Sequence, residues 1–389
     1  MKKTARTSPE FLKDSVVYQL YLRPFTPEGT IKAATGLLPH IAGLGVDIVY
    51  LCPFVVHDDD MREEFWSDRQ HKSKLGNPKN PYRLKDYFTI DDEYGTDDDL
   101  KCFVREAHEL GMKVLFDLVY FHCGPTAVFI DEHPDFVKRD EDGKVINGGW
   151  HFPEINFDSA ELREYLWDNM EYFMREFKVD GYRCDVAPAV PLDFWEEGRK
   201  RMEAIDPECI MISEGDREDD QLAAFDLNYA FRWKYGVIDL MKGDKTAQEI
   251  REIWQKLHDE FPENARFLRI MDDHDIANDC YEDRHCAVCP PEAVEAVLLL
   301  NFTIDGVPFI YNGMEIGDAT RHSIYGNRFY GKDMVINWSK ALTEAGMDRM
   351  QYMSDLIELR RGIPALTESP VKWLENDCPE QVISFSRDN

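Results

Sequence analysis

Two charged residues, Arg183 and Asp185, stand two positions apart at the end of the apolar stretch VDGYRCDV, residues 179–186. Side chains alternate along a β-strand with a period of two, so both residues are expected to point to the same side. Burying such a pair costs free energy unless other groups compensate the charges. This strand end is therefore the first place to look for chemistry.

Three other apolar stretches also end in residues that can carry charge or transfer protons. They end, in chain order, in Asp117 and His122, in Ser213 and Glu214, and in Asp272, Asp273, His274 and Asp275. If these stretches are parallel strands of one barrel, their carboxyl ends meet at one mouth and the side chains share a cavity. Independent ion pairs at separate strand ends are the alternative, but the same design at four strand ends favours a single site.

Several carboxylates in one pocket, together with a cation and imidazoles, are typical of glycoside hydrolysis. One carboxylate attacks or stabilises an oxocarbenium-like centre, and a second carboxylic acid protonates the leaving oxygen. These two groups must titrate differently. Arg183 is predicted to hold Asp185 ionised, whereas Glu214, which faces two aspartates, is predicted to keep its proton. His122 and His274 are suited to donating hydrogen bonds to sugar hydroxyls.

Strand-like and helix-like segments alternate along the chain about eight times. The predicted strands are residues 15–25, 47–54, 113–120, 179–186, 209–215, 224–231, 265–275 and 307–315. The predicted helices are residues 31–44, 96–111, 159–177, 191–205, 246–261, 291–304 and 348–361. This alternation predicts a parallel (β/α)8 TIM barrel. A doubly wound open sheet is the rival fold, but it would place a glycine-rich phosphate-binding turn after the first strand, and the sequence has none there.

The catalytic barrel is expected to cover residues 1–370, including a short insert at 122–157 after the third strand. Residues 57–95 are too long for an ordinary connection and are expected to form a functional loop. Residues 371–389 are typical of two short strands joined by a turn, a vestigial or truncated C-terminal β segment. Because two strands alone are marginally stable, this segment is expected to pack on the barrel or on further chain.

The composition excludes some classes of binding partner. The chain has 45 basic and 75 acidic residues and a formal net charge of −30, so its surface repels nucleic acid and anionic membranes. No apolar run reaches about 18 residues, which argues against a membrane span. The N-terminal segment has two lysines without an apolar run behind them, which argues against a secretory signal. These features predict a cytoplasmic protein; they leave its oligomeric state open.

The chain contains nine cysteines, an odd number, which favours reduced thiols in a reducing compartment. One group, Cys280, His285, Cys286 and Cys289, contains a C-x-x-C pair and a histidine and could ligate a metal. Structural metal sites of this kind usually have a second matched pair, which is missing here. We therefore expect free thiols in this segment.

The four strand ends carry recognisable motifs. They read DLVYFH (117–122), GYRCDV (181–186), ISEG (212–215) and IMDDHD (270–275), and further stretches read PEIN (153–156) and YNGMEIG (311–317). In this order and on these strands, the motifs closely resemble those of the α-amylase family, glycoside hydrolase family 13. The resemblance covers roughly residues 15 to 385. It implies a retaining hydrolase of α-glucosidic bonds, with α-1,4-linked malto-oligosaccharides as the expected substrate class.

The resemblance also implies roles for individual residues. Asp185 would be the nucleophile that forms a covalent glycosyl intermediate, and Glu214 the general acid/base. Asp275 would be a third carboxylate that grips the sugar hydroxyls. Retention of configuration implies that the carboxyl groups of Asp185 and Glu214 lie about 5–5.5 Å apart.

Four further residues would bind the sugar at the reacting position. The resemblance implies that Arg183, His122 and His274 complete this subsite and that Tyr82, in the stretch NPYRLKDY, is the platform on which the sugar ring stacks. The aromatic residues Trp66, Trp150 and Phe152 are candidates for further sugar contacts; packing within the loops is the alternative for each.

The sequence departs from the family pattern in two places near these motifs. Phe121 stands where members that bind calcium usually have asparagine, and a phenyl ring offers no oxygen ligand. We therefore expect no calcium at the usual position and no other cofactor. Starch-cleaving members often carry Lys-His after the nucleophile, whereas this chain has Ala187, Pro188 and Ala189, which predicts a reshaped leaving-group side.

Other activities are compatible with the same motifs. A transglycosylase, an α-glucosidase or a trehalose- or sucrose-active enzyme would use the same intermediate, because water and sugar acceptors compete for it. A family-like protein without catalytic activity, acting through interactions, is a remoter alternative. It would be expected to lack one of the carboxylates, yet Asp185, Glu214 and Asp275 are all present.

Overall fold

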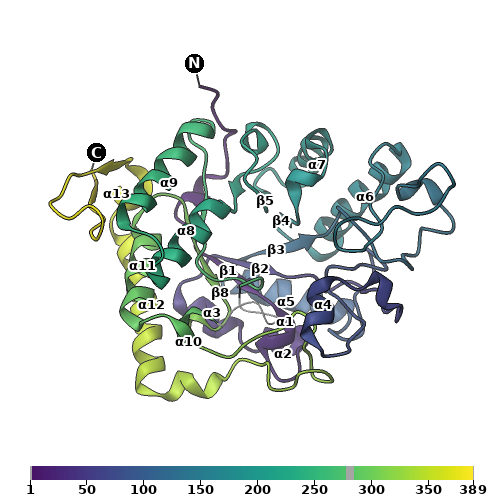
Figure 1. Cartoon of the computed structure of the whole chain (residues 1–389), viewed down its shortest axis with the longest axis horizontal. Helices are drawn as coiled ribbons and strands as arrows, with labels where there is room; N and C mark the ends of the chain where they lie inside the picture. The colour runs from purple at the N-terminus through teal and green to yellow at the C-terminus, as the bar shows by residue number, and fades with distance from the viewer. Residues whose placement is uncertain (1, 277–283, 389) are drawn as a thin grey trace.

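The structure is a computed structural model in which residues 2–276 and 284–388 are described. Eight parallel strands form one sheet in the order β6-β5-β4-β3-β2-β1-β8-β7, and helices surround it (Figure 1). The two ends of this sheet meet at a parallel bridge between Asn228 of β6 and Phe267, just before β7. The (β/α)8 TIM barrel predicted from the sequence is confirmed.

The barrel strands are short, and almost all of their residues are buried. Their bounds are β1 Val17–Leu20, β2 Ile48–Leu51, β3 Lys113–Leu118, β4 Gly181–Cys184, β5 Ile210–Ser213, β6 Leu227–Asn228, β7 Leu268–Arg269 and β8 Val307–Tyr311. Parallel strands covered on both faces read as continuous apolar runs, which is why the sequence placed them well. The register sets Asp117 of β3 directly beside Arg183 of β4.

The helices follow the strands in the usual alternation. Their bounds are α1 Leu22–Phe25, α2 Ile31–Thr35, α3 Leu38–Leu44, α4 Asp68–Ser73, α5 Asp97–Glu109, α6 Ala160–Phe177, α7 Leu192–Ile205, α8 Phe231–Lys242, α9 Ala247–Glu260, α10 His285–Val288, α11 Pro291–Thr303, α12 Glu344–Gly362 and α13 Ala365–Glu368. Side-chain caps fix several of the starts. Thr96 and Asp99 form a reciprocal capping box at α5, as Thr246 and Glu249 do at α9.

Three sequence-based element boundaries are wrong. The helix predicted over 31–44 is two helices, α2 and α3, because Pro39 has no N–H to donate to the Thr35 carbonyl, whereas a proline is tolerated in the first turn of α3. The strands predicted over 15–25 and 265–275 shorten to β1 and β7. The residues that follow β7, including Asp275, therefore lie on a loop rather than on a strand.

The sequence analysis also missed a helix. Residues 224–231 were predicted as a strand, but only Leu227–Asn228 pairs in the sheet, and α8 begins at Phe231. Aromatic and β-branched residues have modest helix propensity, so the local signal was weak. Burial of one face of α8, including Trp233 and Val237, stabilises the helix through tertiary packing instead.

The long loop between β2 and α5 is hydrogen-bonded to the loop that follows β8. Ser67 Oγ lies 2.9 Å from the Tyr325 hydroxyl, and the Asn77 side chain donates to the Tyr325 carbonyl at 2.8 Å. Farther along, Glu93 accepts from Arg23 at 2.9 Å and from Asn327 at 3.0 Å. These bonds hold the two loops together over the mouth of the barrel near β1.

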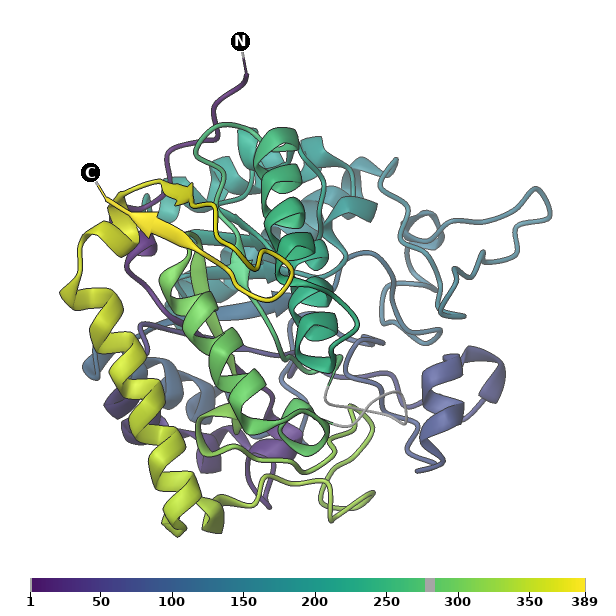
Figure 2. The ribbon, with the colours of Figure 1, turned by 60° about the vertical axis from the view of Figure 1, so that its left-hand side comes forward.

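The segment between β3 and α6 contains few regular elements and projects from the barrel (Figure 2). It is held near its base by a bridge between His122 and Glu154 and by another between Val137 and Ile155. Trp150 is 45% exposed, so this segment presents an aromatic side chain at the cavity described below.

The C-terminal residues form an antiparallel hairpin of β9 (Val371–Trp373) and β10 (Phe385–Arg387). Figure 2 shows this yellow hairpin against the outer helices. Trp373 contacts Trp254 of α9 with ring centroids 5.6 Å apart, and Glu375 pairs with Arg251 at 3.0 Å. The expectation that two strands here pack on the barrel is confirmed. None of the helices described in the structure has the length and apolar character needed to span a bilayer.

Gly181 begins β4 and provides a test of how tightly this strand is held. Its φ of 149° is disfavoured for other residues, and an added Cβ would lie 1.9 Å from the Ile210 carbonyl oxygen of β5. Gly181→Ala is therefore expected to lower the free energy of unfolding by about 3 kcal/mol or more, measured by chemical denaturation. Gly111→Ala is the control, because Gly111 also has a positive φ of 80° but no atom within 4 Å of the added Cβ. Equal losses for the two variants would contradict the proposed clash.

Candidate active site

Arg183 lies at the centre of the site and contacts three carboxylates. Its Nη1 donates to Asp117 Oδ1 at 2.7 Å and to Asp185 Oδ1 at 2.8 Å, and its Nη2 lies 2.6 Å from Glu214 Oε1. The Arg183 side chain is fully buried. One guanidinium thus connects the ends of β3, β4 and β5, because the strand register brings the three acids around it.

This arrangement corrects the predicted division of charge between Asp185 and Glu214. The sequence analysis predicted that Arg183 pairs with Asp185 alone, but in the structure Arg183 contacts three acids. Burial raises the pKa of Asp185 well above its usual range despite the opposing charge of Arg183, and it also raises the pKa of Glu214. The raised pKa predicted for Glu214 is thus present, whereas Asp185 is not singled out as the ionised acid.

The backbone next to Asp185 is strained, and this conformation provides a hydrogen-bond donor to Glu214. Val186 adopts the left-handed conformation with φ of 43°, which is rare for a β-branched residue. In this conformation its N–H donates to Glu214 Oε2 at 2.8 Å. The residues after it, Ala187–Ala189, form a short 3-10 helix. A Cβ on Gly215 would lie 2.1 Å from Pro188, so glycine is needed there for this turn to pack behind Glu214.

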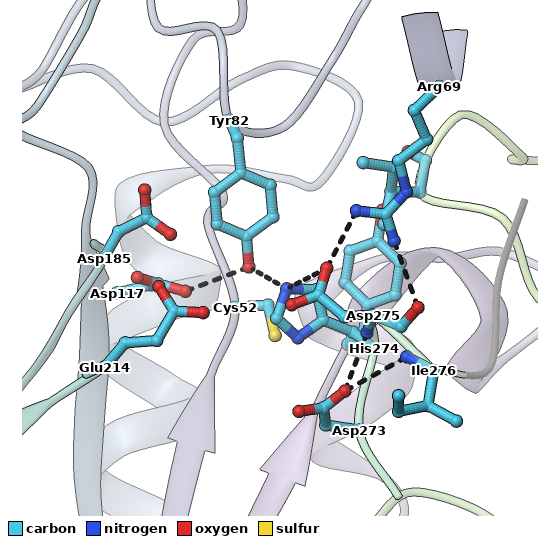
Figure 3. Close-up of polar contacts among 12 residues, drawn as sticks. Cys52, Arg69, Tyr82, Asp117, Asp185, Glu214, Asp273, His274, Asp275 and Ile276 are labelled. Atoms are coloured by element: carbon cyan, nitrogen blue, oxygen red, sulfur yellow. Dashed lines mark hydrogen bonds and ion pairs between the residues drawn. The ribbon is translucent and has the colours of Figure 1, made fainter. Parts of the chain in front are cut away.

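Asp275 lies across the cavity from Asp185 and Glu214 (Figure 3). Arg69 of α4 donates from Nη1 to Asp275 Oδ1 at 2.8 Å. Burial alone would raise the pKa of Asp275, but the neighbouring His274, Arg69 and Lys234 outweigh it and hold the pKa below its usual range. Asp275 is thus the most clearly ionised acid of the site. The neighbouring Asp273 is engaged separately by the buried Lys234.

A chain of hydrogen bonds joins β1 to Asp117 (Figure 3). Gln19 Nε2 donates to His274 Nδ1 at 2.7 Å, so the proton of the His274 ring is on His274 Nε2. His274 Nε2 lies 2.7 Å from the Tyr82 hydroxyl. Tyr82 in turn donates to Asp117 Oδ2 at 3.1 Å. Burial lowers the pKa of His274, so the ring is neutral. Tyr82 is therefore held with its half-buried ring lining the cavity.

His122 has a different hydrogen-bonding role from the one predicted. Its Nε2 lies 2.6 Å from the Tyr82 carbonyl oxygen and must donate to it. Burial lowers the pKa of His122 to about 4, so the ring is neutral and Nδ1 is an acceptor. No group among the described residues bonds to Nδ1. The sequence analysis expected His122 to donate to a sugar hydroxyl, but in the structure its Nε2 donor is used by the Tyr82 carbonyl.

The predicted site residues come together around one cavity of about 520 Å³. Tyr82, His122, Asp185, Glu214, His274 and Asp275 line it. Arg183 lies beneath its floor, bonded to two of them. Trp150 and Phe152 also line the cavity, whereas Trp66 is buried and absent from its wall. The volume is typical of pockets for small ligands.

Arg69 and Tyr235 are among the cavity residues that sequence reasoning missed. Arg69 comes from the loop between β2 and α5, where no motif marked it, and Tyr235 comes from the missed helix α8. Tyr235 is 49% exposed and stacks on Phe231 with ring centroids 6.2 Å apart. An i,i+4 aromatic pair at the start of a helix was a usable signal for Tyr235, had the helix been recognised.

The residues around Phe121 do not fit the calcium site that the family pattern implies. The Phe121 ring packs edge-on against His122 and against Trp150, each with ring centroids 5.9 Å apart, and offers no oxygen. Within residues 2–276 and 284–388, one acidic and imidazole cluster is close enough to share an ion, Asp273, His274 and Asp275. Lys234, Tyr82 and Arg69 already engage its members. Of the group that could ligate a metal, Cys286 and Cys289 form no disulfide, and Cys280 lies outside the described residues.

The shared arginine makes the stability of the fold depend on pH in a testable way. Removing Arg183 as Arg183→Gln leaves three buried acids without their cation, so the pKa values of Asp185 and Glu214 should rise further above their unfolded-state values. An acid with a raised folded-state pKa loses stability as pH rises from its unfolded pKa through its folded pKa. The variant should therefore be less stable by about 3–5 kcal/mol at pH 7 and by less near pH 5, measured by urea denaturation. An equal loss at both pH values would contradict this account.

Comparison with known proteins agrees with the fold and the site. The sequence matches the family described as Alpha amylase, catalytic domain, over residues 7–142 and 148–359. It is 28% identical to Alpha-amylase MalA of Haloarcula japonica, with 98% of this chain and 54% of that protein aligned. It is 26% identical to a Cyclomaltodextrinase of Bacillus sp, with 98% and 72% aligned, and 25% identical to an Intracellular maltogenic amylase of Bacillus subtilis, with 98% and 67% aligned. The chain thus spans about half of the first relative and about two thirds or more of the other two.

A solved structure shows the same architecture. The maltogenic alpha-amylase AmyB from Thermotoga neapolitana superposes with a TM-score of 0.82 at 27% identity, covering 96% of this chain and 83% of that one. The family match extends over most of the sequence, including all four strand ends that form the cavity. The chain belongs to the α-amylase family of glycoside hydrolases.

Proposed function

We propose that the protein hydrolyses α-1,4-glucosidic bonds of malto-oligosaccharides with retention of configuration. The observation that carries the proposal is the pairing of Asp185 and Glu214 on one buried arginine, at a cavity whose opposite wall carries an ionised Asp275. Two carboxyl groups close enough to flank one glycosidic bond are what double displacement requires. Relatives named as amylases and a cyclomaltodextrinase support the substrate class.

In the reactive form the proton is on Glu214 and Asp185 is ionised beside Arg183. Asp185 then attacks and bonds to the anomeric carbon of the sugar, while Glu214 protonates the glycosidic oxygen that departs from that carbon. Burial favours the protonated form of Glu214 at the start, as a general acid needs. Once Asp185 is bonded to the sugar it carries no negative charge. Arg183 then pairs only with Asp117 and Glu214. This favours ionised Glu214, which in the second step removes a proton from water as the water oxygen attacks the anomeric carbon. The bond from that carbon to Asp185 breaks, and Asp185 leaves as a carboxylate.

The remaining residues are proposed to bind the sugar at the reacting position. Tyr82 is fixed at its hydroxyl by His274 and Asp117, so its ring is a rigid surface for stacking. His122 lines the same cavity, and Asp275 accepts from sugar hydroxyls. The turn Ala187–Ala189 and Gly215 shape the leaving-group side, and Tyr235 offers an exposed aromatic ring in the same wall.

The function is tested with 4-nitrophenyl α-maltoside and with maltotriose. Asp185→Asn is expected to lower kcat/KM at least about 1,000-fold, because the nucleophile is lost, and NMR should show the α-anomer as the first product of the wild-type protein. Asp98→Asn, an exposed position on α5, is the control and should keep full activity. Initial release of the β-anomer, or equal rates for Asp185→Asn and the wild type, would contradict the proposal. Longer products in the maltotriose reaction would reveal transglycosylation.

We propose that the protein works without calcium at the usual position of the family, because Phe121 fills that place with an apolar ring packed on Trp150. Excess EDTA is therefore expected to leave Tm unchanged within about 1 °C and to leave turnover unchanged. The measurement is thermal unfolding of metal-free protein, repeated after calcium is added back. A rise in Tm of several degrees on adding calcium would contradict the proposal.

We also propose a cytoplasmic location. None of the eight cysteines described in the structure forms a disulfide, and three of them, Cys52, Cys184 and Cys209, lie on or beside buried strands, as expected in a reducing compartment. The Bacillus subtilis relative is named intracellular.

A further inference from the structure

Arg69 is a charged residue of the cavity wall to which the reaction described above gives no role. Its side chain is 23% exposed, and its Nη1 donates to Asp275 Oδ1 at 2.8 Å. A second, longer contact of 3.4 Å joins Nη2 to the Asp275 carbonyl oxygen. Figure 3 shows Arg69 reaching down from the chain above Tyr82 and Asp275 to this carboxylate. The guanidinium thus lies beside the acid that is proposed to grip sugar hydroxyls.

The short helix that carries Arg69 is held by specific contacts on both sides. Ser67 caps α4 by accepting from the Gln70 N–H and lies 2.9 Å from the Tyr325 hydroxyl. The buried Gln70 side chain donates to the carbonyls of Asn77 at 2.9 Å and Pro78 at 3.1 Å. Arg69 is therefore presented to the cavity by a supported element rather than by an unanchored loop.

A partly exposed ion pair contributes little to stability by itself, typically below about 1 kcal/mol, so folding alone does not explain this placement. Asp275 is 32% exposed, and its Oδ2 accepts no hydrogen bond from the described residues. The pair combines an acceptor oxygen with a planar guanidinium that has five N–H donors. It is also neutral overall, which suits an uncharged ligand.

We propose that Arg69 and Asp275 together recognise two adjacent hydroxyls of the sugar at the reacting position: one hydroxyl donates to Asp275 Oδ2, and its neighbour accepts from the Arg69 guanidinium. Arg69 is then a specificity-determining residue contributed by the loop between β2 and α5. This inference rests on the proposed function and adds a hydroxyl-binding residue to it.

The test compares two substrates in each protein. One is 4-nitrophenyl α-maltoside, and the other is its analogue without the 3-hydroxyl on the glucosyl unit whose bond is cleaved; the 3-position is chosen because it is not adjacent to the reacting carbon. The wild-type protein should prefer the parent substrate in kcat/KM. Arg69→Gln and Arg69→Met should reduce that preference about 10- to 100-fold, the loss expected for one hydrogen bond to a charged group.

Arg62→Gln is the matched control, since Arg62 belongs to the same loop, pairs with Asp60 and is absent from the cavity wall. It should keep the wild-type preference. If both Arg69 variants fold, as judged by thermal unfolding, and slow the two substrates by the same factor, Arg69 only supports the loop and the inference is wrong. Absence of turnover by the wild-type protein would instead overturn the proposed function, and this inference with it. Two different substitutions are used so that a folding failure of one still leaves a decisive variant.

Discussion

The site depends on one buried cation that is shared by three acids. Arg183 satisfies Asp117, Asp185 and Glu214, and each acid comes from a different strand end. A single positive charge is too little to neutralise three carboxylates, and burial makes the excess negative charge expensive. Burial therefore raises the pKa values of Asp185 and Glu214. This shortage of positive charge destabilises the site, but it also favours the protonated form of Glu214, which is the form that an acid catalyst needs.

The rest of the site can be understood as support for that arrangement. From the opposite side of the barrel, Gln19 fixes the His274 ring, which fixes the Tyr82 hydroxyl, which reaches Asp117. This chain crosses from β1 to β3 through side chains of two loops, so the sugar-facing ring of Tyr82 and the charged floor are positioned together. Asp275 lies near two other cations, Arg69 and Lys234, which keep it ionised without a contact to Arg183.

The barrel and the acidic strand ends could be predicted because they are encoded locally. Buried parallel strands are continuous apolar runs, and the charged residue that ends each run stands out against them. The sharing of Arg183 could not be predicted in this way, because it depends on the register that sets Asp117 beside Arg183 across two strands. Nearness in sequence suggested Asp185 as its only partner. The role of His122 was misjudged for a similar reason, since its donor is used by a carbonyl 40 residues away. Arg69 and Tyr235 lie on a loop and on a weakly encoded helix, where only tertiary contacts place them.

The hydrogen bonds between the loop preceding α5 and the loop following β8 have a consequence for how such enzymes diversify. Ser67 and Asn77 of the first loop both contact Tyr325 of the second, and Glu93 of the first is bonded to Asn327 of the second. A change in one loop alone would leave buried polar groups of the other without partners, at a cost comparable to that of losing several hydrogen bonds. The two segments are therefore expected to be inherited and exchanged as a single module, although more than 200 residues of sequence separate them.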